Sequence, residues 1–261
     1  MNKTILITGA TSGFGRAIAM RFAQEGYTIC ITGRRDHRLT ELKAELEKKH
    51  GVKVIKVTFD VRNRKHVEAA IDELKTHVER IDILVNNAGL AAGMSTIDEG
   101  DVDDWDAMID TNIKGLLHVT RQIAPMMRQQ ASGHIINIGS TAAKMVYKNG
   151  NVYCATKFAV DALNQAMRID LLPYGIKVTA IHPGMAETEF SLVRFKGDEE
   201  RAKNVYAGLN PLRAEDIADI AWYVATLPPH VCINDLTVTC LTQANSYYSI
   251  KDAERVKPAN P

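Results

Sequence analysis

The stretch LITGATSGFG, residues 6–15, places three glycines between an apolar run and a helical segment: Gly9, Gly13 and Gly15. Their spacing, G-x-x-x-G-x-G, differs from the G-x-G-x-x-G dinucleotide pattern. The physical requirement is the same, because residues without Cβ allow a tight turn that brings backbone N–H groups and a helix N-terminus against a pyrophosphate. Thr11 and Ser12 add hydroxyl donors. The stretch predicts a nucleotide-binding turn, and a merely tight strand-to-helix connection is the alternative.

Around this turn, short β-branched runs alternate with segments of helical periodicity, which is typical of a parallel sheet. The expected strands are KTILIT, YTICIT, VKVIKVTF, IDILVN, HIINIG, IKVTAIH and INDLTVTCL. Right-handed crossovers then predict a single-domain α/β protein, a Rossmann-type doubly wound parallel sheet of about seven strands with helices on both faces. A long helical stretch is expected from about residue 102 to 130.

We expect one domain over residues 1–245 and a polar C-terminal tail over 246–261. Within the domain, residues 183–213 form a mostly polar excursion with helical pieces, which is typical of a lid at the carboxyl edge of a parallel sheet. The tail ends in prolines and is expected to be disordered or ordered by a neighbouring subunit.

Composition excludes several classes of protein. The chain has 46% hydrophobic and 24% charged residues, and 32 basic against 31 acidic side chains, so neither nucleic acid nor an anionic membrane is an expected partner. No C-x-x-C pair occurs among the four cysteines, and the N-terminus enters a strand without a leader-like apolar run. A reduced, cytoplasmic protein is expected. The eight histidines show no metal-ligand spacing, so no metal is expected.

The end of the second predicted strand indicates which nucleotide is bound. A carboxylate there usually accepts a hydrogen bond from the ribose of NAD, whereas this sequence offers Arg34 and Arg35. Guanidinium groups suit a 2′-phosphate, so we expect NADP(H), with a solvated arginine pair as the alternative. Asp36 is explained as the N-cap of the next helix.

Tyr153 and Lys157 lie four residues apart and share one face of a predicted helix. We expect the ammonium of Lys157 to favour the phenolate and lower the pKa of Tyr153, which makes the phenol a proton donor and acceptor near neutral pH. Ser140 follows the strand HIINIG at the edge where such sheets bind ligands. The same Y-x-x-x-K spacing recurs at Tyr247 and Lys251, in the tail, where we interpret it as chance.

With these motifs in this order, the chain resembles the short-chain dehydrogenase/reductase family over about residues 3–245. The motifs are TGATSGFG at residues 8–15, NNAG at 86–89, Asn112 in DTNIKG, Ser140, YCATK at 153–157 and the Pro183-Gly184 pair. The resemblance implies that Ser140, Tyr153, Lys157 and Asn112 are catalytic and that Asn112 distorts its helix and holds a proton-relay water. The expected cofactor contacts are Gly9, Thr11, Ser12, Gly13, Phe14, Gly15, Arg34, Arg35, Asp60, Val61, Asn87, Ala88, Gly89, Tyr153, Lys157, Pro183, Gly184, Met185 and Thr188.

The implied reaction is hydride transfer from NADPH to a carbonyl carbon. Ser140 orients the oxygen, Tyr153 protonates it, and Lys157 with Asn112 replenishes the proton. A non-catalytic NADP(H) sensor is a competing class, although a sensor has no chemical reason to retain the Ser–Tyr–Lys set. A sugar-nucleotide epimerase would need a larger C-terminal substrate domain. The resemblance also implies a homotetramer.

Several segments, among them GHIINIGSTA and EFSLVRFKGD, resemble the NADP-dependent 3-hydroxy acid dehydrogenases, which act on serine, allo-threonine, 3-hydroxypropionate and malonic semialdehyde. The likeness to sulfoacetaldehyde reductases, which make isethionate, is also close. Both substrate types are small anionic carbonyls, and Arg194 is expected to bind the anion as a bidentate fork. An exposed Arg194 paired with Asp198 or Glu199 is the alternative.

Tyr147 and Gln243 are expected to complete the substrate pocket with hydroxyl and amide groups. Lys144, the YKNGN segment at 147–151 and the extended tail with Tyr247 and Tyr248 depart from the serine-oxidising members. These departures leave the sulfonate alternative open.

Overall fold

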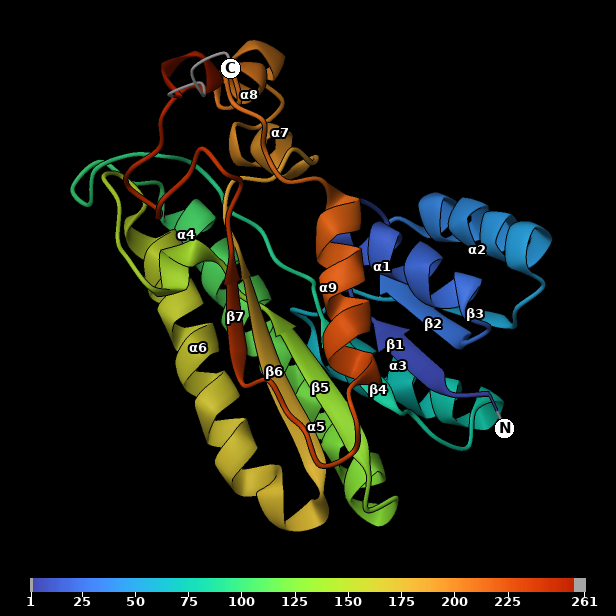
Figure 1. Ribbon diagram of the computed structural model, residues 1–261. Helices are drawn as coiled ribbons and strands as arrows, with labels where there is room; N and C mark the ends of the chain where they lie inside the picture. The colour runs from blue at the N-terminus through green and yellow to red at the C-terminus, as the bar shows by residue number, and fades with distance from the viewer. Residues whose placement is uncertain (1, 256–261) are drawn as a thin grey trace.

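The computed structural model describes residues 2–255, so residues 256–261 of the predicted tail lie outside it. One seven-stranded parallel sheet has the order β3-β2-β1-β4-β5-β6-β7, as the predicted doubly wound fold requires (Figure 1). Its strands are β1 (Thr4–Ile7), β2 (Thr28–Gly33), β3 (Val54–Thr58), β4 (Ile83–Asn86), β5 (Gly133–Ile138), β6 (Ile176–Pro183) and β7 (Asp235–Val238). The order reverses between β1 and β4, which creates the crevice where such sheets bind ligands.

Helices cover both faces of the sheet. They are α1 (Gly13–Gln24), α2 (Asp36–His50), α3 (Arg64–His77), α4 (Val102–Ile109), α5 (Leu116–Gln129), α6 (Asn151–Leu171), α7 (Phe190–Arg194), α8 (Glu199–Asn204) and α9 (Ala214–Thr226). The short helical turns are η1 (Asp110–Gly115), η2 (Thr141–Ala143), η3 (Leu172–Tyr174) and η4 (Asp252–Glu254). The continuous helix predicted from 102 to 130 is therefore three segments, because the π-helical turn η1 separates α4 from α5.

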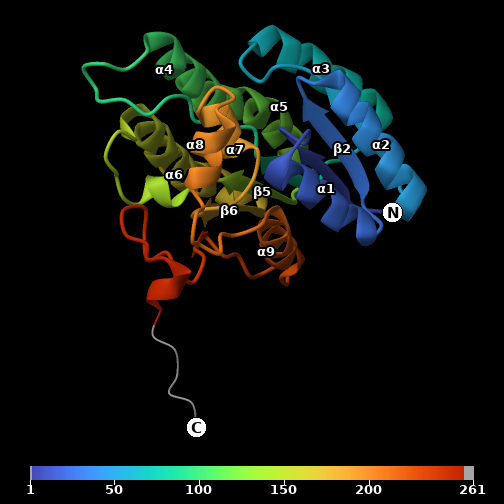
Figure 2. The same cartoon turned by 90° about the horizontal axis from the view of Figure 1, so that it is seen from above.

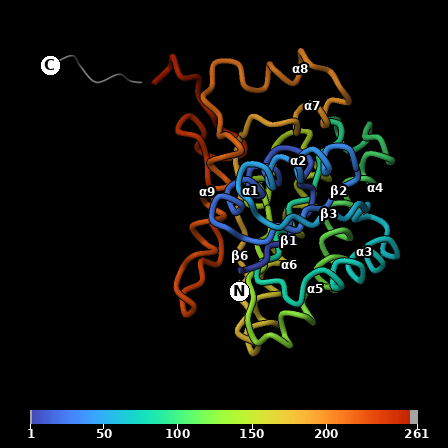
Figure 3. The backbone as a smooth tube through the Cα atoms, turned by 90° about the vertical axis from the view of Figure 1, so that its right-hand side faces the viewer, coloured from blue at the N-terminus to red at the C-terminus, as the bar shows by residue number. Residues whose placement is uncertain are grey.

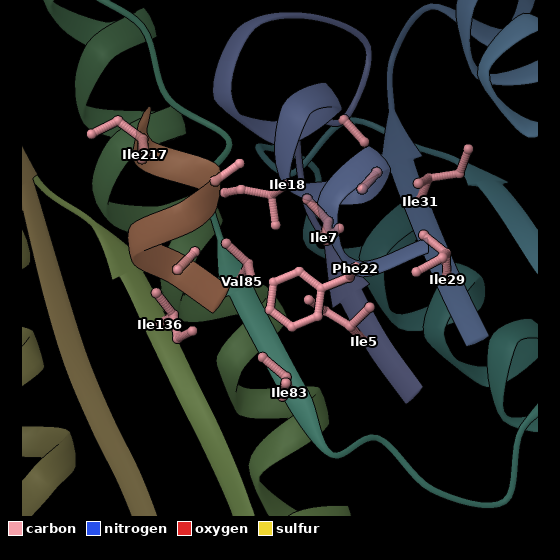
Figure 4. Packing of buried hydrophobic residues seen from close by; sticks show 14 of the residues in the cluster. Ile5, Ile7, Ile18, Phe22, Ile29, Ile31, Ile83, Val85, Ile136 and Ile217 are labelled. Carbon is pink, nitrogen blue, oxygen red and sulfur yellow. The ribbon is translucent and has the colours of Figure 1, made fainter. Parts of the chain in front are cut away.

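Two apolar clusters hold these helices against the sheet. On one face α1, α2 and α9 pack on the strands through residues such as Phe22, Leu39 and Ile217. Figure 4 shows Phe22 of α1 lying over β1 and β4, beside Ile5 and Ile83. On the other face α3, α5 and α6 form the second cluster. The central strands β1, β4 and β5 are buried almost throughout, which explains why their apolar residues do not alternate with exposed ones, whereas the edge strand β7 alternates exposed and half-buried residues.

The segment from Pro183 to Arg213 rises above the sheet at one end of the molecule. In Figures 1 and 3 its helices α7 and α8 stand at that end, apart from the sheet layers. Seen from above in Figure 2, they lie between α6 and α1, over the ends of β5 and β6. The chain then returns through α9, which packs against α1. The excursion predicted from sequence thus contains two short helices that overhang the crevice.

His134 in β5 makes the stability of this fold depend on pH. Its Nε2 donates to the Thr179 hydroxyl at 2.8 Å, because that hydroxyl itself donates to the Ile233 carbonyl, and Nδ1 has no partner among the described residues. Burial, with a smaller effect from Lys177, lowers the pKa of His134 to about 3. In the unfolded chain it returns to about 6.5, so below that pH the unfolded state binds a proton that the folded state rejects.

We therefore expect the free energy of unfolding to fall as pH falls from about 6.5 toward 3. From pH 7.5 to 5.5 His134 contributes a loss on the order of 1 kcal/mol. Urea unfolding of the wild type and of His134→Gln at both pH values measures this loss. The variant should lose correspondingly less, and equal losses in both proteins would show that His134 is not the cause.

Candidate active site

A cleft of about 530 Å³ opens at the carboxyl edge of the sheet, under α7 and α8. The ends of β1, β2, β4, β5 and β6 meet there, joined by parts of the lid and of the tail. The predicted site residues that line it are Gly9, Thr11, Ser12, Gly13, Phe14, Arg34, Arg35, Asp60, Val61, Asn87, Ala88, Gly89, Ser140, Tyr147, Tyr153, Lys157, Pro183, Gly184, Met185, Thr188, Arg194 and Gln243. Gly15 and Asn112 lie behind this lining and support it.

The glycine turn has the close approaches predicted for it. Gly9 has φ +66°, and a Cβ there would lie 2.9 Å from the Ala88 Cα. A Cβ on Gly15 would lie 2.5 Å from the Gly9 carbonyl oxygen. The Asn87 amide donates to the carbonyls of Thr8 and Gly9 at 2.8 and 3.1 Å, which ties the end of β4 to the turn. The N-terminus of α1 thus faces a backbone-lined cradle that fits a pyrophosphate.

The arginines after β2 form a cationic corner beside this cradle. Arg35 donates to the hydroxyls of Thr11 and Ser12 at 2.8 and 2.9 Å, and Arg34 lies 3.9 Å from Asp60. The predicted N-cap was wrong: Arg35 occupies the cap position, and Asp36 begins α2 with its carboxylate accepting from Lys56 and Thr58. That carboxylate is engaged with β3 and does not face the cleft.

Three further predicted cofactor contacts, Asp60, Val61 and Thr188, are held by hydrogen bonds within the chain. Asp60 accepts from the Arg62 guanidinium at 2.7 Å, and the Val61 carbonyl lies 3.0 Å from the Nδ1 of His118. The Thr188 hydroxyl accepts from the Phe190 N–H at 3.2 Å. These bonds set the backbone of two loops that border the cleft, one after β3 and one after β6.

The structure brings Ser140, Tyr153 and Lys157 together. Tyr153 and Lys157 share the inner face of α6, and both are buried. The Lys157 ammonium donates to the Ile138 carbonyl at 3.0 Å and lies 5.9 Å from the centroid of the Tyr153 ring. Ser140 caps η2, its hydroxyl accepting from the Ala142 N–H at 3.1 Å. An acid, a cation and a hydroxyl therefore line the same cleft.

The predicted electrostatics of this set were wrong. Burial raises the pKa of the Tyr153 phenol, the Tyr147 phenol adds to the increase, and a hydrogen bond with Ser140 and the charge of Arg194 oppose it without prevailing. Burial also lowers the pKa of Lys157 to about 8. The site excludes water well enough for the cost of desolvation to exceed the attraction between the two side chains. At neutral pH the phenol keeps its proton.

Asn112 lies in η1, where the helix widens, and its amide is fully used. The side-chain oxygen accepts from the Leu90 N–H at 2.9 Å, while the nitrogen donates to the Leu90 carbonyl at 2.8 Å and to Thr156 at 3.0 Å. These bonds clamp the segment after β4 against α6, directly behind Lys157. Asn112 thus positions both walls of the cleft.

The second Y-x-x-x-K copy lacks this geometry. Tyr247 and Lys251 lie in an irregular segment, not on a common helix face, and the Tyr247 side chain is 74% exposed. The environment of the first copy, rather than its spacing, therefore distinguishes the two.

Arg194, the last residue of α7, faces the tyrosines. Its Cζ lies 5.4 Å from the ring centroid of Tyr147 and 5.6 Å from that of Tyr153, and its Nε donates to the Gly93 carbonyl at 3.3 Å. Within residues 2–255 it makes no ion pair, so the predicted alternative of a pair with Asp198 or Glu199 was wrong.

Gln243 also lines the cleft, but both ends of its amide are engaged within the chain. Its oxygen accepts from the Met185 N–H at 2.7 Å, and its nitrogen donates to the Asn245 carbonyl at 3.1 Å. Gln243 thus joins the loop after β6 to the segment that follows β7.

Two groups of charged residues were not predicted from the sequence. Arg38 and Glu189 border the cationic corner. The helical spacing of Arg38 from Arg35, three residues, could have indicated Arg38. No sequence pattern links Glu189 to either arginine. Behind Ser140, the ligand atoms of Asp161, His182 and Asp235 lie within 4.8 Å of one another. The Lys144 ammonium donates to both of these carboxylates, so a cation already occupies that group.

Comparison with known proteins identifies the family of this chain. Residues 3–198 match the family described as short chain dehydrogenase. The chain is 46% identical over 251 residues to sulfoacetaldehyde reductase 2 of Chromohalobacter salexigens, covering 96% of this chain and 99% of the relative. It is 47% identical over 247 residues to the NADP-dependent 3-hydroxy acid dehydrogenase YdfG of Salmonella typhi, covering 94% and 98%.

A solved structure described as the closed form of serine dehydrogenase complexed with NADP⁺ superposes with a TM-score of 0.90 at 46% identity, covering 95% of this chain and 98% of the other. The chain belongs to the short-chain dehydrogenase family. The predicted family and fold class are thereby confirmed. Across residues 2–255, none of the helices has the length and apolar character that crossing a membrane requires.

Proposed function

We propose that this chain is an NADP(H)-dependent oxidoreductase that interconverts a small anionic aldehyde or ketone and its alcohol, of the 3-hydroxy acid type. Its substrates would include malonic semialdehyde and 3-hydroxypropionate, serine and allo-threonine. The observation that carries this proposal is the Arg194 guanidinium, which lies beside the Tyr153 ring without a carboxylate partner among the described residues. A substrate anion would neutralise the Arg194 guanidinium while the substrate carbonyl lies at the Tyr153 phenol.

The cleft has the features that a bound NADP(H) requires. The glycine turn gives a cradle without side chains, α1 points its N-terminus at it, and Arg35 supplies a guanidinium beside it. With the carboxylate of Asp36 held by Lys56 and Thr58, no acidic group after β2 is directed to a ribose 2′-hydroxyl. The names of the relatives support the same cofactor.

The proposed reaction follows from the protonation states of Tyr153 and Lys157. When bound, NADPH supplies the hydride, and the electron pair of the carbonyl double bond moves to oxygen. Tyr153 is neutral at pH 7 and donates its proton to that oxygen, while Ser140 holds the oxygen in place. Lys157, with a pKa near 8, returns a proton to the phenolate. Asn112 keeps the wall that carries Lys157 in position.

Substrate selection is assigned to Arg194 and Tyr147, which contact each other beside Tyr153 in the cleft. Tyr147 is largely buried, and its ring faces Arg194. A sulfonate would fit the same guanidinium, so sulfoacetaldehyde, reduced to isethionate, is the alternative substrate that the relatives favour. We also propose a homotetramer, on the strength of the family resemblance, and a cytoplasmic location, on the strength of four cysteines that form no C-x-x-C pair.

The test is an assay of NADPH oxidation with malonic semialdehyde, sulfoacetaldehyde and propanal, together with NADP⁺ reduction by serine and 3-hydroxypropionate. We expect kcat/KM for an anionic aldehyde to exceed that for propanal by about tenfold or more, because a charge-assisted fork is lost with the neutral substrate. The ratio of the two anionic aldehydes decides between carboxylate and sulfonate. Binding of NADPH without turnover of any substrate would favour the sensor and contradict the proposal.

A further inference from the structure

Glu189 connects the lid to the cationic corner. It lies immediately before α7, and each of its carboxylate oxygens accepts from a different arginine: Oε2 from Arg35 at 3.0 Å and Oε1 from Arg38 at 2.6 Å. More than 150 residues separate the partners in sequence. The three side chains are 36 to 40% exposed, so water partly screens the two ion pairs; Arg35 and Glu189 line the cleft, and Arg38 lies beside them.

The arrangement is that of two guanidinium groups sharing one anion. Arg35 donates to the hydroxyls of Thr11 and Ser12 in the glycine turn through Nε and Nη2, which leaves Nη1 to donate to Glu189. Arg38 follows one helical turn later and faces the same anion. Such a pair suits a phosphate monoester at least as well as a carboxylate, because a phosphate offers three acceptor oxygens and a larger charge.

We propose that Glu189 is an internal competitor of the 2′-phosphate of NADP(H) for Arg35 and Arg38, and that it thereby sets how strongly the site prefers NADP(H) over NAD(H). The inference rests on the proposed cofactor and adds Arg38 to its ligands. The 2′-phosphate must displace the Glu189 carboxylate. Breaking that ion pair makes the free energy of NADP(H) binding less favourable. NAD(H), which carries a hydroxyl at that position, does not displace it.

Equilibrium binding of NADPH, NADH and adenosine 2′,5′-bisphosphate tests this without turnover. Calorimetric titrations would compare the wild type with Glu189→Gln. We expect Glu189→Gln to bind NADPH and the bisphosphate about threefold to tenfold more tightly, and NADH with little change, since two partly exposed ion pairs are removed. Glu187→Gln is the matched control, because Glu187 is exposed, lies two residues away and pairs with no arginine within residues 2–255.

Each outcome has one meaning. Arg38→Gln should weaken NADPH about tenfold and leave NADH unchanged if Arg38 is a phosphate ligand. Equal gains for NADPH and NADH in Glu189→Gln, gains of the same size in Glu187→Gln, or weaker NADPH binding in Glu189→Gln would overturn the competition. A wild-type protein that binds NADH as well as NADPH would instead overturn the proposed cofactor.

Discussion

Replacing Tyr153 with Phe is expected to lower kcat about 10³-fold, because the phenol is the proton donor to the developing alkoxide and a positioned general acid contributes about 10² to 10⁴. The substitution removes one oxygen from a buried ring that also packs against Phe190 at a centroid distance of 5.7 Å, so the ring itself stays in place. Steady-state NADPH oxidation with an anionic aldehyde measures the loss, and calorimetry with NADPH shows that the cofactor still binds.

Tyr223→Phe provides the control for this experiment. Tyr223 lies on α9, is 56% exposed and does not line the cleft, so its loss should leave kcat unchanged. A Tyr153→Phe protein that retains wild-type turnover would refute the assignment of the proton donor. Loss of NADPH binding along with turnover would show that the phenol holds the cofactor rather than the reacting oxygen.

Replacing Arg194 with Ala is expected to raise KM for an anionic aldehyde about 10- to 100-fold and to leave KM for propanal within about twofold. A hydrogen bond to a charged group contributes about 1.5 to 3 kcal/mol, which corresponds to this range. Arg194→Lys should recover only part of the loss, because an ammonium keeps the charge but not the planar fork. The measurement is KM and kcat for both aldehydes in the wild type and the two variants.

Arg201→Ala serves as the control in the same lid. Arg201 stacks on Phe195 at 4.4 Å and lies outside the cleft lining, so its removal subtracts one positive charge without touching the site. If Arg201→Ala raises KM as much as Arg194→Ala, the increase in KM comes from the overall positive charge of the lid and not from a contact of Arg194 with the substrate. If Arg194→Ala raises KM equally for propanal, Arg194 shapes the pocket and does not bind an anion.

The mechanism depends on a feature that motif spacing does not reveal. The spacing of Tyr153 and Lys157 places them on one helix face, and from this a lowered phenol pKa was predicted. Their burial produces the reverse in the described chain: a more basic phenolate and a less basic amine. For a reductase this state is useful, because the acid is protonated and its neighbour can deliver a proton at neutral pH.

Sequence alone determined the order of strands and helices, the glycine turn, and the residues whose chemistry meets at the carboxyl edge. These features follow from local patterns: β-branched runs form buried strands, glycines permit the close approach of β1 and β4, and parallel strands bring their ends to one edge. The same patterns made the 102–130 region look like one helix, because a π-helical turn at Asp110–Gly115 leaves helical periodicity almost unchanged.

Only the tertiary structure decided which charged groups pair and how far the site is shielded from water. Glu189 reaches Arg35 and Arg38, Lys144 reaches Asp235, and the amide oxygen of Gln243 accepts from Met185 in the loop after β6, each across more than 50 residues of sequence. A pattern of neighbouring residues carries no information about such pairs. Because burial and long-range pairing set the free energy of every charge, the pKa values and partners of the site residues emerge only when the chain has folded.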